Sequence, residues 1–259
     1  MTPRIGNDVV DLARPRTSAL AGDERFLKRV LAAEEREALA AAADPGVELW
    51  SRWAAKEAAY KALTKLAGTT PPFVHRAFVA RWSAPGGGAA PPAAHRADAP
   101  VREGRVRWNG VEAHVRVLAG PGVLHAVAVA PAEAKPLEAA DDAHDARGAH
   151  ASLALLDEPG APWAEPFEEL LGRFSEREAE AVRSRPSAAV RLGARAAVAR
   201  LLEVAEERVE LVCAPGPVTR RPPRVLLDGL PAPADVSLSH DGRWIAWAVC
   251  PERVAEACP

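Results

Sequence analysis

Ile5-Gly6-Asn7-Asp8-Val9-Val10-Asp11-Leu12 predicts a short buried strand, and Trp53-Ala54-Ala55-Lys56-Glu57-Ala58-Ala59-Tyr60-Lys61-Ala62-Leu63 predicts a helix. The strand carries Asp8 among apolar residues, where an unpaired acid costs free energy. On the helix, Trp53, Glu57 and Lys61 are spaced four residues apart and share one face. If both acids meet, they form a site of hard oxygen ligands suited to Mg²⁺, which completes its shell with water and phosphate.

Glu57 also has a simpler interpretation. A Glu57–Lys61 ion pair at i, i+4 would stabilise the helix by about 0.3–0.5 kcal/mol without any function. Asp8 favours the metal site, because a second acid in an apolar element is equally out of place.

Composition restricts the class of protein. Of the 259 residues, 48% are hydrophobic and 26% charged, which indicates a packed globular core. The net charge of −2 argues against bulk binding to nucleic acid. The three cysteines, Cys213, Cys250 and Cys258, form no CxxC pair, which favours reduced thiols in a cytoplasmic protein. No signal peptide or membrane-spanning apolar window is visible, so no membrane partner is expected.

The pattern along the first half predicts alternating helices and strands. Asp23 should cap a helix that begins near Glu24 and ends at Asp44-Pro45-Gly46, and Gly68 should end a second helix that begins near Val47. Further strands are expected over 73–82 and 124–129, with a hairpin over 101–117 that turns at Asn109-Gly110. The Gly- and Pro-rich segment 83–100 is expected to be a mobile loop.

The second half predicts a similar unit. A helix is expected over 188–204, followed by strands over 209–212, 224–227, 235–239 and 244–249. When the halves are compared, Lys56–Leu63 lines up with Ala194–Leu201, and each half offers a helix followed by a strand that ends near a proline. We therefore predict an α+β fold, a pseudo-dimer of two related α/β lobes, each with a small, mainly antiparallel sheet packed on a long helix. The expected boundaries are 1–135, a linker over 136–150, and 151–259.

The first half resembles the 4′-phosphopantetheinyl transferases of the small carrier-protein synthase type. Ile5 to Leu12 is similar to the opening strand of that type. Arg25 to Leu31, followed by Glu34 and Glu35, is similar to its next helix, and Trp53 to Leu63 matches its lysine–glutamate helix. Three motifs occur in order at plausible spacing, which makes the resemblance fairly specific.

The second half resembles a different part of the same superfamily. Asp235 to Trp244 contains Ser239-His240 and is similar to the serine–histidine strand and turn of the larger, two-lobed type, which helps to bind coenzyme A. The preceding basic helix of that type is matched by Arg191, Arg195 and Arg200, and Arg221-Pro222 by its basic residue and proline.

Two departures from the family pattern matter. The order of the two lobes is reversed relative to the two-lobed enzymes, so the lobes that face each other could come from one chain or from two; two lobes in one chain favour a monomer. The two-lobed type usually has a further acid two residues after its first aspartate, where this chain has Val10. Asp8 and Glu57 are therefore the expected metal ligands, and Asp11 is expected to be a supporting or structural residue.

The resemblance implies an Mg²⁺-dependent transfer of the phosphopantetheine arm of coenzyme A to a serine of an apo acyl or peptidyl carrier protein, with release of adenosine 3′,5′-bisphosphate. Asp8, Glu57 and Lys61 would be the catalytic residues, with Glu57 accepting the serine proton directly or through a water. The resemblance assigns the phosphates of coenzyme A to a set of cofactor-binding residues: Lys56, Arg191, Arg195, Arg221, Ser239 and His240. Two alternatives stay open at this point, a catalytically silent relative that binds coenzyme A or a carrier protein, and an Mg²⁺-dependent phosphohydrolase.

Overall fold

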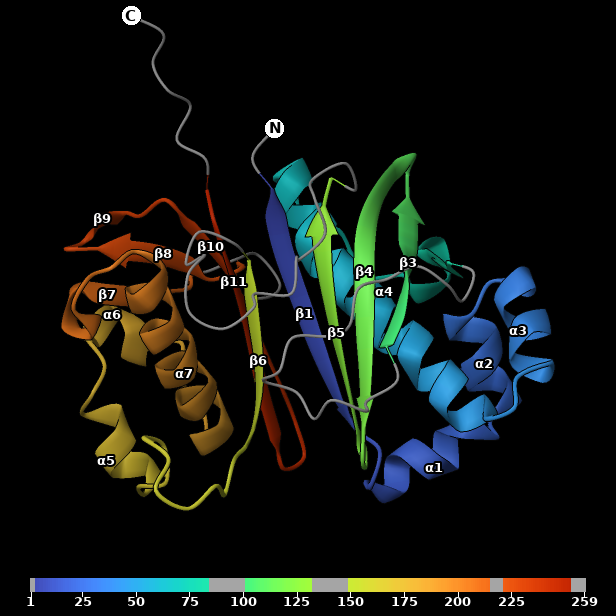
Figure 1. The fold of residues 1–259 in the computed structure, drawn as a ribbon, viewed down its shortest axis with the longest axis horizontal. Coiled ribbons are helices and arrows are strands. Elements are labelled where there is room, and N and C mark those ends of the chain that lie inside the picture. Colours follow the sequence, from blue (N-terminus) through green and yellow to red (C-terminus); the bar gives the residue numbers. More distant parts are fainter. Residues whose placement is uncertain (1–2, 84–100, 132–148, 215–220, 253–259) are drawn as a thin grey trace, which may run out of the picture.

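The computed structural model describes residues 3–83, 101–131, 149–214 and 221–252. It has the predicted α+β architecture, with two lobes side by side (Figure 1). The elements from β1 to β5 form one lobe and those from β6 to β11 form the other, and β1 lies where the two lobes meet. Among the described residues, no helix is long and apolar enough to cross a membrane.

The N-terminal lobe is an antiparallel sheet of five strands in the order β1-β5-β4-β3-β2. Their bounds are β1 (Arg4–Asp11), β2 (Val79–Trp82), β3 (Val101–Trp108), β4 (Val111–Gly120) and β5 (Val123–Ala130). The β3–β4 hairpin turns at Asn109 and Gly110, whose positive φ angles of 48° and 79° suit a tight two-residue turn. Both the hairpin and its Asn-Gly turn are confirmed.

Helix α4 (Pro45–Ala67) packs on one face of this sheet. The carboxylate of Asp44 caps its N-terminus by accepting a hydrogen bond from the Val47 amide at 2.9 Å. Gly68 ends the helix with a φ of +67°, a left-handed conformation that glycine adopts without strain. The predicted long helix is therefore confirmed, and it begins two residues earlier than expected.

Two N-terminal elements differ from the prediction. The single helix expected from Glu24 to Asp44-Pro45-Gly46 is divided into α2 (Glu24–Val30) and α3 (Ala33–Ala40). The break occurs because Leu31 is extended and the Glu35 carboxylate folds back to accept a hydrogen bond from the Ala32 amide. The expected strand over 73–82 is a strand only from Val79, preceded by the 3-10 turn η1 (His75–Ala77). Helix α1 (Pro15–Ala21), which the sequence did not predict, connects β1 to α2.

The C-terminal lobe has two three-stranded antiparallel sheets, in the orders β10-β11-β6 and β7-β8-β9. Its strands are β6 (His150–Leu155), β7 (Val209–Val212), β8 (Arg224–Leu227), β9 (Leu230–Pro231), β10 (Ala234–Asp241) and β11 (Trp244–Pro251). Its helices are α5 (Phe167–Leu171), α6 (Glu176–Ala179) and α7 (Arg185–Leu201), with the 3-10 turn η2 (Glu206–Arg208) before β7. The predicted loop over 83–100 and linker over 136–150 lie almost wholly outside the described residues, and His150 begins β6.

One glycine in each lobe allows the long helix to approach its sheet closely. A Cβ at Gly6 on β1 would lie 2.0 Å from the carbonyl oxygen of Ala58 on α4. A Cβ at Gly193 on α7 would lie 2.6 Å from the indole ring of Trp247 on β11. These contacts are too short for any side chain, so both helices sit against their sheets because glycine is present.

The two lobes are joined along β1 and β10 by a regular set of hydrogen bonds. As an edge strand, β1 has alternate backbone amides that no strand of its own sheet can accept. Side chains of β10 accept them instead, in the pairs Ile5–Asp235 (2.8 Å), Asn7–Ser237 (2.9 Å), Val9–Ser239 (3.2 Å) and Asp11–Asp241 (3.0 Å). We call these four bonds the lobe ladder. They fix the register between the lobes and show that the facing lobes belong to one chain.

Candidate active site

A cavity of about 400 Å³ opens at one end of the lobe ladder. Four elements or their flanks contribute to its wall: β1, the start of α1, α4 and β10. The polar side chains of the wall include Asp8, Glu57, Lys61, Ser239, His240 and Asp241, and the aromatic part comes from Trp50 and Trp53. The structure thus brings together both predicted metal ligands, the predicted catalytic lysine and the serine–histidine pair.

Asp8 is almost completely buried in this wall, with 9% of its surface exposed. Its Oδ1 atom accepts hydrogen bonds from Lys61 Nζ at 3.1 Å and from Ser239 Oγ at 2.9 Å. Burial raises the pKa of Asp8 from 3.8 to about 6; the Lys61 cation opposes that rise, and the nearby Glu57 carboxylate adds to it. A carboxylate with a raised pKa beside a second carboxylate is a site that a cation would stabilise.

Glu57 lies beside a residue to which the sequence assigned no role. His75 Nε2 lies 3.3 Å from Glu57 Oε1, and the imidazole ring lies against Trp53 and Phe73, with ring centroids 4.0 and 3.9 Å away. His75 sits in the 3-10 turn after α4, where a strand was expected. Because the sequence pattern did not give the path of that turn, it could not indicate that the imidazole would reach Glu57.

Lys61 connects the helix to the strand that carries Asp8. In addition to Asp8, its Nζ donates to the Asn7 carbonyl at 2.7 Å. One turn further along α4, Lys65 donates to the carbonyl oxygens of Ile5 and Val236, each at 2.7 Å, and forms an ion pair with Asp235 at 3.0 Å. Lys61 therefore faces the cavity, whereas Lys65 ties α4 to both lobes.

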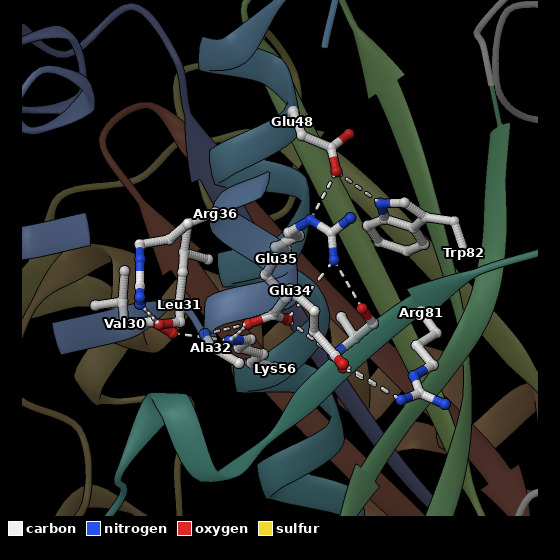
Figure 2. A network of polar contacts seen from close by, with 12 residues as sticks. Val30, Leu31, Ala32, Glu34, Glu35, Arg36, Glu48, Lys56, Arg81 and Trp82 are labelled. Carbon is white, nitrogen blue, oxygen red and sulfur yellow. Dashed lines mark hydrogen bonds and ion pairs between the residues drawn. The ribbon is translucent and has the colours of Figure 1, made fainter. Parts of the chain in front are cut away.

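The prediction that Lys56 contacts phosphate does not fit its position. Its side chain is fully buried, and Nζ donates to Glu35 Oε2 at 2.5 Å and to the Val30 carbonyl at 2.7 Å (Figure 2). On a helix, adjacent residues point about 100° apart, so Lys56 lies on a different face of α4 from Glu57. Lys56 instead links α4 to α2 and α3, and burial lowers its pKa while Glu35 opposes that effect.

The serine–histidine pair lies at the cavity, but its two side chains differ. Ser239 is buried and bonded to Asp8, whereas His240 is exposed at the cavity wall. Desolvation lowers the pKa of His240, and the cations Lys61 and Arg191 lower it further against the effect of Asp241. His240 is therefore available to a ligand, and Ser239 is already engaged within the protein.

The three predicted phosphate-binding arginines do not line this cavity. Arg191 is buried and donates to the Ser187 side chain at 2.6 Å and the Ser187 carbonyl at 2.9 Å. Arg195 lines a separate hollow of the C-terminal lobe, where its guanidinium donates to the Arg173 carbonyl at 2.9 Å and to Glu206 at 3.3 Å. Arg221 is exposed. On α7, Arg191 and Arg195 form these hydrogen bonds within their own lobe. The pattern of charges alone could not reveal these partners.

Asp11 has the structural role that was expected. Its side chain accepts hydrogen bonds from the amides of Ala13 at 3.0 Å and Arg243 at 3.2 Å, and its own amide belongs to the lobe ladder. Asp11 therefore fixes the turn after β1 and the turn after β10.

The two predicted metal ligands, the carboxylates of Asp8 and Glu57, both line the cavity. In this part of the chain, no group of three or more His, Cys, Asp or Glu residues could hold a metal ion. Both hydrogen bonds to the Asp8 carboxylate end on Oδ1, and no described residue donates to Oδ2. A carboxylate oxygen of this kind beside Glu57 fits Mg²⁺, which binds through one or two carboxylates and takes its other ligands from water and phosphate.

Comparison with known proteins identifies similar chains. Residues 4–86 match the model of the 4′-phosphopantetheinyl transferase superfamily. The holo-[acyl-carrier-protein] synthase of Azoarcus sp. (strain BH72) is 54% identical over 59 residues, which are 23% of this chain and 47% of that protein. The synthase of Aromatoleum aromaticum is 48% identical over an alignment of the same length. The chain thus spans about half the length of the relatives that it matches. A solved holo-[acyl-carrier-protein] synthase from Thermotoga maritima aligns with 50% of this chain and 63% of its own, at 18% identity and a TM-score of 0.34.

Proposed function

We propose that this chain, whose residues 4–86 belong to the 4′-phosphopantetheinyl transferase superfamily, transfers the 4′-phosphopantetheine arm of coenzyme A to a serine of an apo carrier protein. One observation carries the proposal: Asp8, Glu57 and Lys61 of the N-terminal lobe line one cavity with His240 of the C-terminal lobe. The stretch that matches the superfamily model, residues 4–86, includes Asp8, Glu57 and Lys61, which supports the same chemistry here.

Asp8 and Glu57 are the residues that would hold Mg²⁺. When bound, the ion would polarise the pyrophosphate of coenzyme A and offset the charge that develops on the leaving group. The chain supplies two carboxylates from two rigid elements, β1 and α4, so the geometry of the site depends on the packing of that helix on that strand.

The transfer itself exchanges one bond for another. The serine oxygen of the carrier forms a bond to the phosphorus that bears the pantetheine arm, and the bond from that phosphorus to adenosine 3′,5′-bisphosphate breaks. Glu57 accepts the serine proton, directly or through a water, and His75 lies beside its carboxylate. Lys61 stabilises the negative charge of the departing phosphate, and His240 contacts the nucleotide phosphates from the opposite lobe.

The proposal assigns one task to each lobe. Residues 1–135 form the metal-binding lobe and residues 151–259 the coenzyme A-binding lobe, joined by 136–150. The lobe ladder supports a site completed within one chain, so we propose that the active form is a monomer. We also propose that it acts in the cytoplasm, where its cysteines would stay reduced.

A mass measurement tests this function. The full chain is incubated with coenzyme A, Mg²⁺ and either an apo acyl carrier protein or an apo peptidyl carrier protein, and the carrier is then weighed. We expect a gain of one phosphopantetheine on one of the two carriers and its loss when EDTA replaces Mg²⁺.

Two results would contradict the proposal. Coenzyme A binding by calorimetry without modification of either carrier would indicate a silent binding protein. Breakdown of coenzyme A without carrier modification would indicate a phosphohydrolase.

A further inference from the structure

We infer that Ser239 is a positioning residue that fixes the carboxylate of Asp8 for a divalent cation, so that the C-terminal lobe completes the metal site of the N-terminal lobe. The inference rests on the proposed function in one respect, which is that Asp8 is a metal ligand. It differs from the role that the serine–histidine resemblance implies for Ser239, which is contact with coenzyme A.

The hydrogen bonds of Ser239 determine where its hydroxyl proton goes. Ser239 Oγ accepts from the Val9 amide at 3.2 Å and lies 2.9 Å from Asp8 Oδ1. A hydroxyl has one proton, and an ionised carboxylate can only accept, so Ser239 donates to Asp8. The buried hydroxyl of Ser239 thus accepts a hydrogen bond from β1 and donates its proton to Asp8.

The direction of these bonds orients Asp8. Ser239 and Lys61 both donate to Oδ1, one from β10 and the other from α4. Together they engage Oδ1 from two elements and leave Oδ2, to which no described residue donates, available to a cation. Hydrogen bonds to a ligating carboxylate are known to set its orientation and the affinity of a site for its metal.

The lobe ladder supplies a matched comparison. Ser237 accepts from the Asn7 amide at 2.9 Å, just as Ser239 accepts from the Val9 amide two residues further along both strands. Both serines are buried, with 2% and 8% of their surfaces exposed. Of these two serines, Ser239 is the one with a hydrogen bond to Asp8, a carboxylate of the cavity. Removing either hydroxyl removes one bond of the lobe ladder, and removing that of Ser239 also removes a hydrogen bond to Asp8.

The experiment measures Mn²⁺ binding to the full chain by electron paramagnetic resonance, with no coenzyme A or carrier present. Wild type, S237A, S239A and S239T are compared, with D8N as the variant that lacks the ligand. We expect S239A to weaken Mn²⁺ binding by about 10-fold or more, as loss of a group that orients a metal ligand does. S237A should bind as wild type does, and S239T, which keeps the hydroxyl, should restore the affinity.

The outcomes separate this inference from the proposed function. If wild type and D8N bind Mn²⁺ equally, Asp8 is not a ligand, and both are overturned. If wild type binds more tightly than D8N but S239A matches S237A, the inference fails and the proposed function stands. If S239A does not fold while S237A does, S239T decides, because a folded S239T that has lost Mn²⁺ affinity overturns the role of the hydroxyl.

Discussion

Helices α4 and α7 are the long helices of the two lobes, yet they direct their charged residues differently. Three lysines of α4 reach three places: Lys56 the interior, Lys61 the cavity and Lys65 the boundary between the lobes. On α7, Arg191 and Arg195 form their hydrogen bonds within the C-terminal lobe. The helical residues proposed to take part in the chemistry therefore lie on α4, whereas α7 packs within the lobe that supplies Ser239 and His240.

The contrast is clearest at two positions that the sequence comparison aligns. Glu57 on α4 corresponds to Arg195 on α7. Glu57 lines the cavity, and Arg195 lines a separate hollow beside Glu178 and Arg208. Aligned positions on the two long helices thus line different hollows of the molecule.

Glu57→Gln should have the largest effect on activity. The amide keeps the shape of the side chain but cannot accept the serine proton and is a weaker ligand for a cation. We expect kcat/KM for carrier modification to fall by about 10²–10⁴-fold, with the far-UV circular dichroism spectrum unchanged. Near-normal turnover in this variant would remove Glu57 from the mechanism.

Lys56→Met should have the largest effect on stability, because it tests the interior position beside Glu57. The change leaves the buried Glu35 carboxylate without its closest cation, and breaking a buried pair from one side costs about 3–5 kcal/mol. Urea unfolding measures the loss. Lys61→Met is the control, because that ion pair is partly exposed, and it should destabilise the protein much less. Equal losses would contradict the separation of the two lysines.

Asp8 should make stability and metal binding depend on pH in opposite directions. Its pKa is raised from 3.8 to about 6 in the folded protein, so the folded state holds the proton more tightly, and stability falls as pH rises through this window. Asp8→Asn should therefore raise the free energy of unfolding at pH 8 by about 1–3 kcal/mol, and the gain should shrink at pH 5. Urea unfolding at both pH values tests this.

Metal binding gives the second half of the Asp8 prediction. A protonated carboxylate does not bind a cation, so the affinity of wild type for Mn²⁺ should fall as pH drops below about 6. An affinity that stays constant from pH 8 to pH 5 would contradict the role of Asp8.

His75→Gln should have an intermediate effect. The imidazole lies beside Glu57, so its loss should misplace the carboxylate and lower kcat by about 10-fold, with a smaller change in KM for coenzyme A. His114→Gln is the control, because His114 lies on β4 and does not line the cavity. Equal effects of the two substitutions would mean that His75 acts only through stability.

Local patterns predicted much of this molecule. Periodicity indicated α4 and capping residues marked two helix ends correctly, with Asp23 at the start of α2 and Gly68 at the end of α4, and the Asn109-Gly110 turn indicated the hairpin. The cavity also brings together Asp8, Glu57 and Lys61 as expected, because an acid in an apolar strand and an acid on an apolar helix face need a common environment. Whether these residues act as proposed stays a prediction.

Features that depend on distant partners could not be predicted in the same way. Lys56 and Glu57 are neighbours in sequence, and only the packing of α3 on α4 decides that the first is interior. Each bond of the lobe ladder joins residues 230 positions apart. No local sequence pattern can therefore predict that the Ser239 hydroxyl bonds to Asp8 instead of contacting a ligand. The break between α2 and α3 depends likewise on Glu35, whose carboxylate binds the Ala32 amide and Lys56.

Arg195→Gln should have the smallest effect, and it tests the α7 side of the comparison between the two long helices. The guanidinium stacks over Phe174 and pairs with the partly exposed Glu206, so its loss should cost about 1 kcal/mol in urea unfolding. Because Arg195 does not line the cavity, KM for coenzyme A should equal that of wild type. A large rise in KM with unchanged stability would mean that coenzyme A extends to the far side of α7, and the two helices would then share the binding of one substrate.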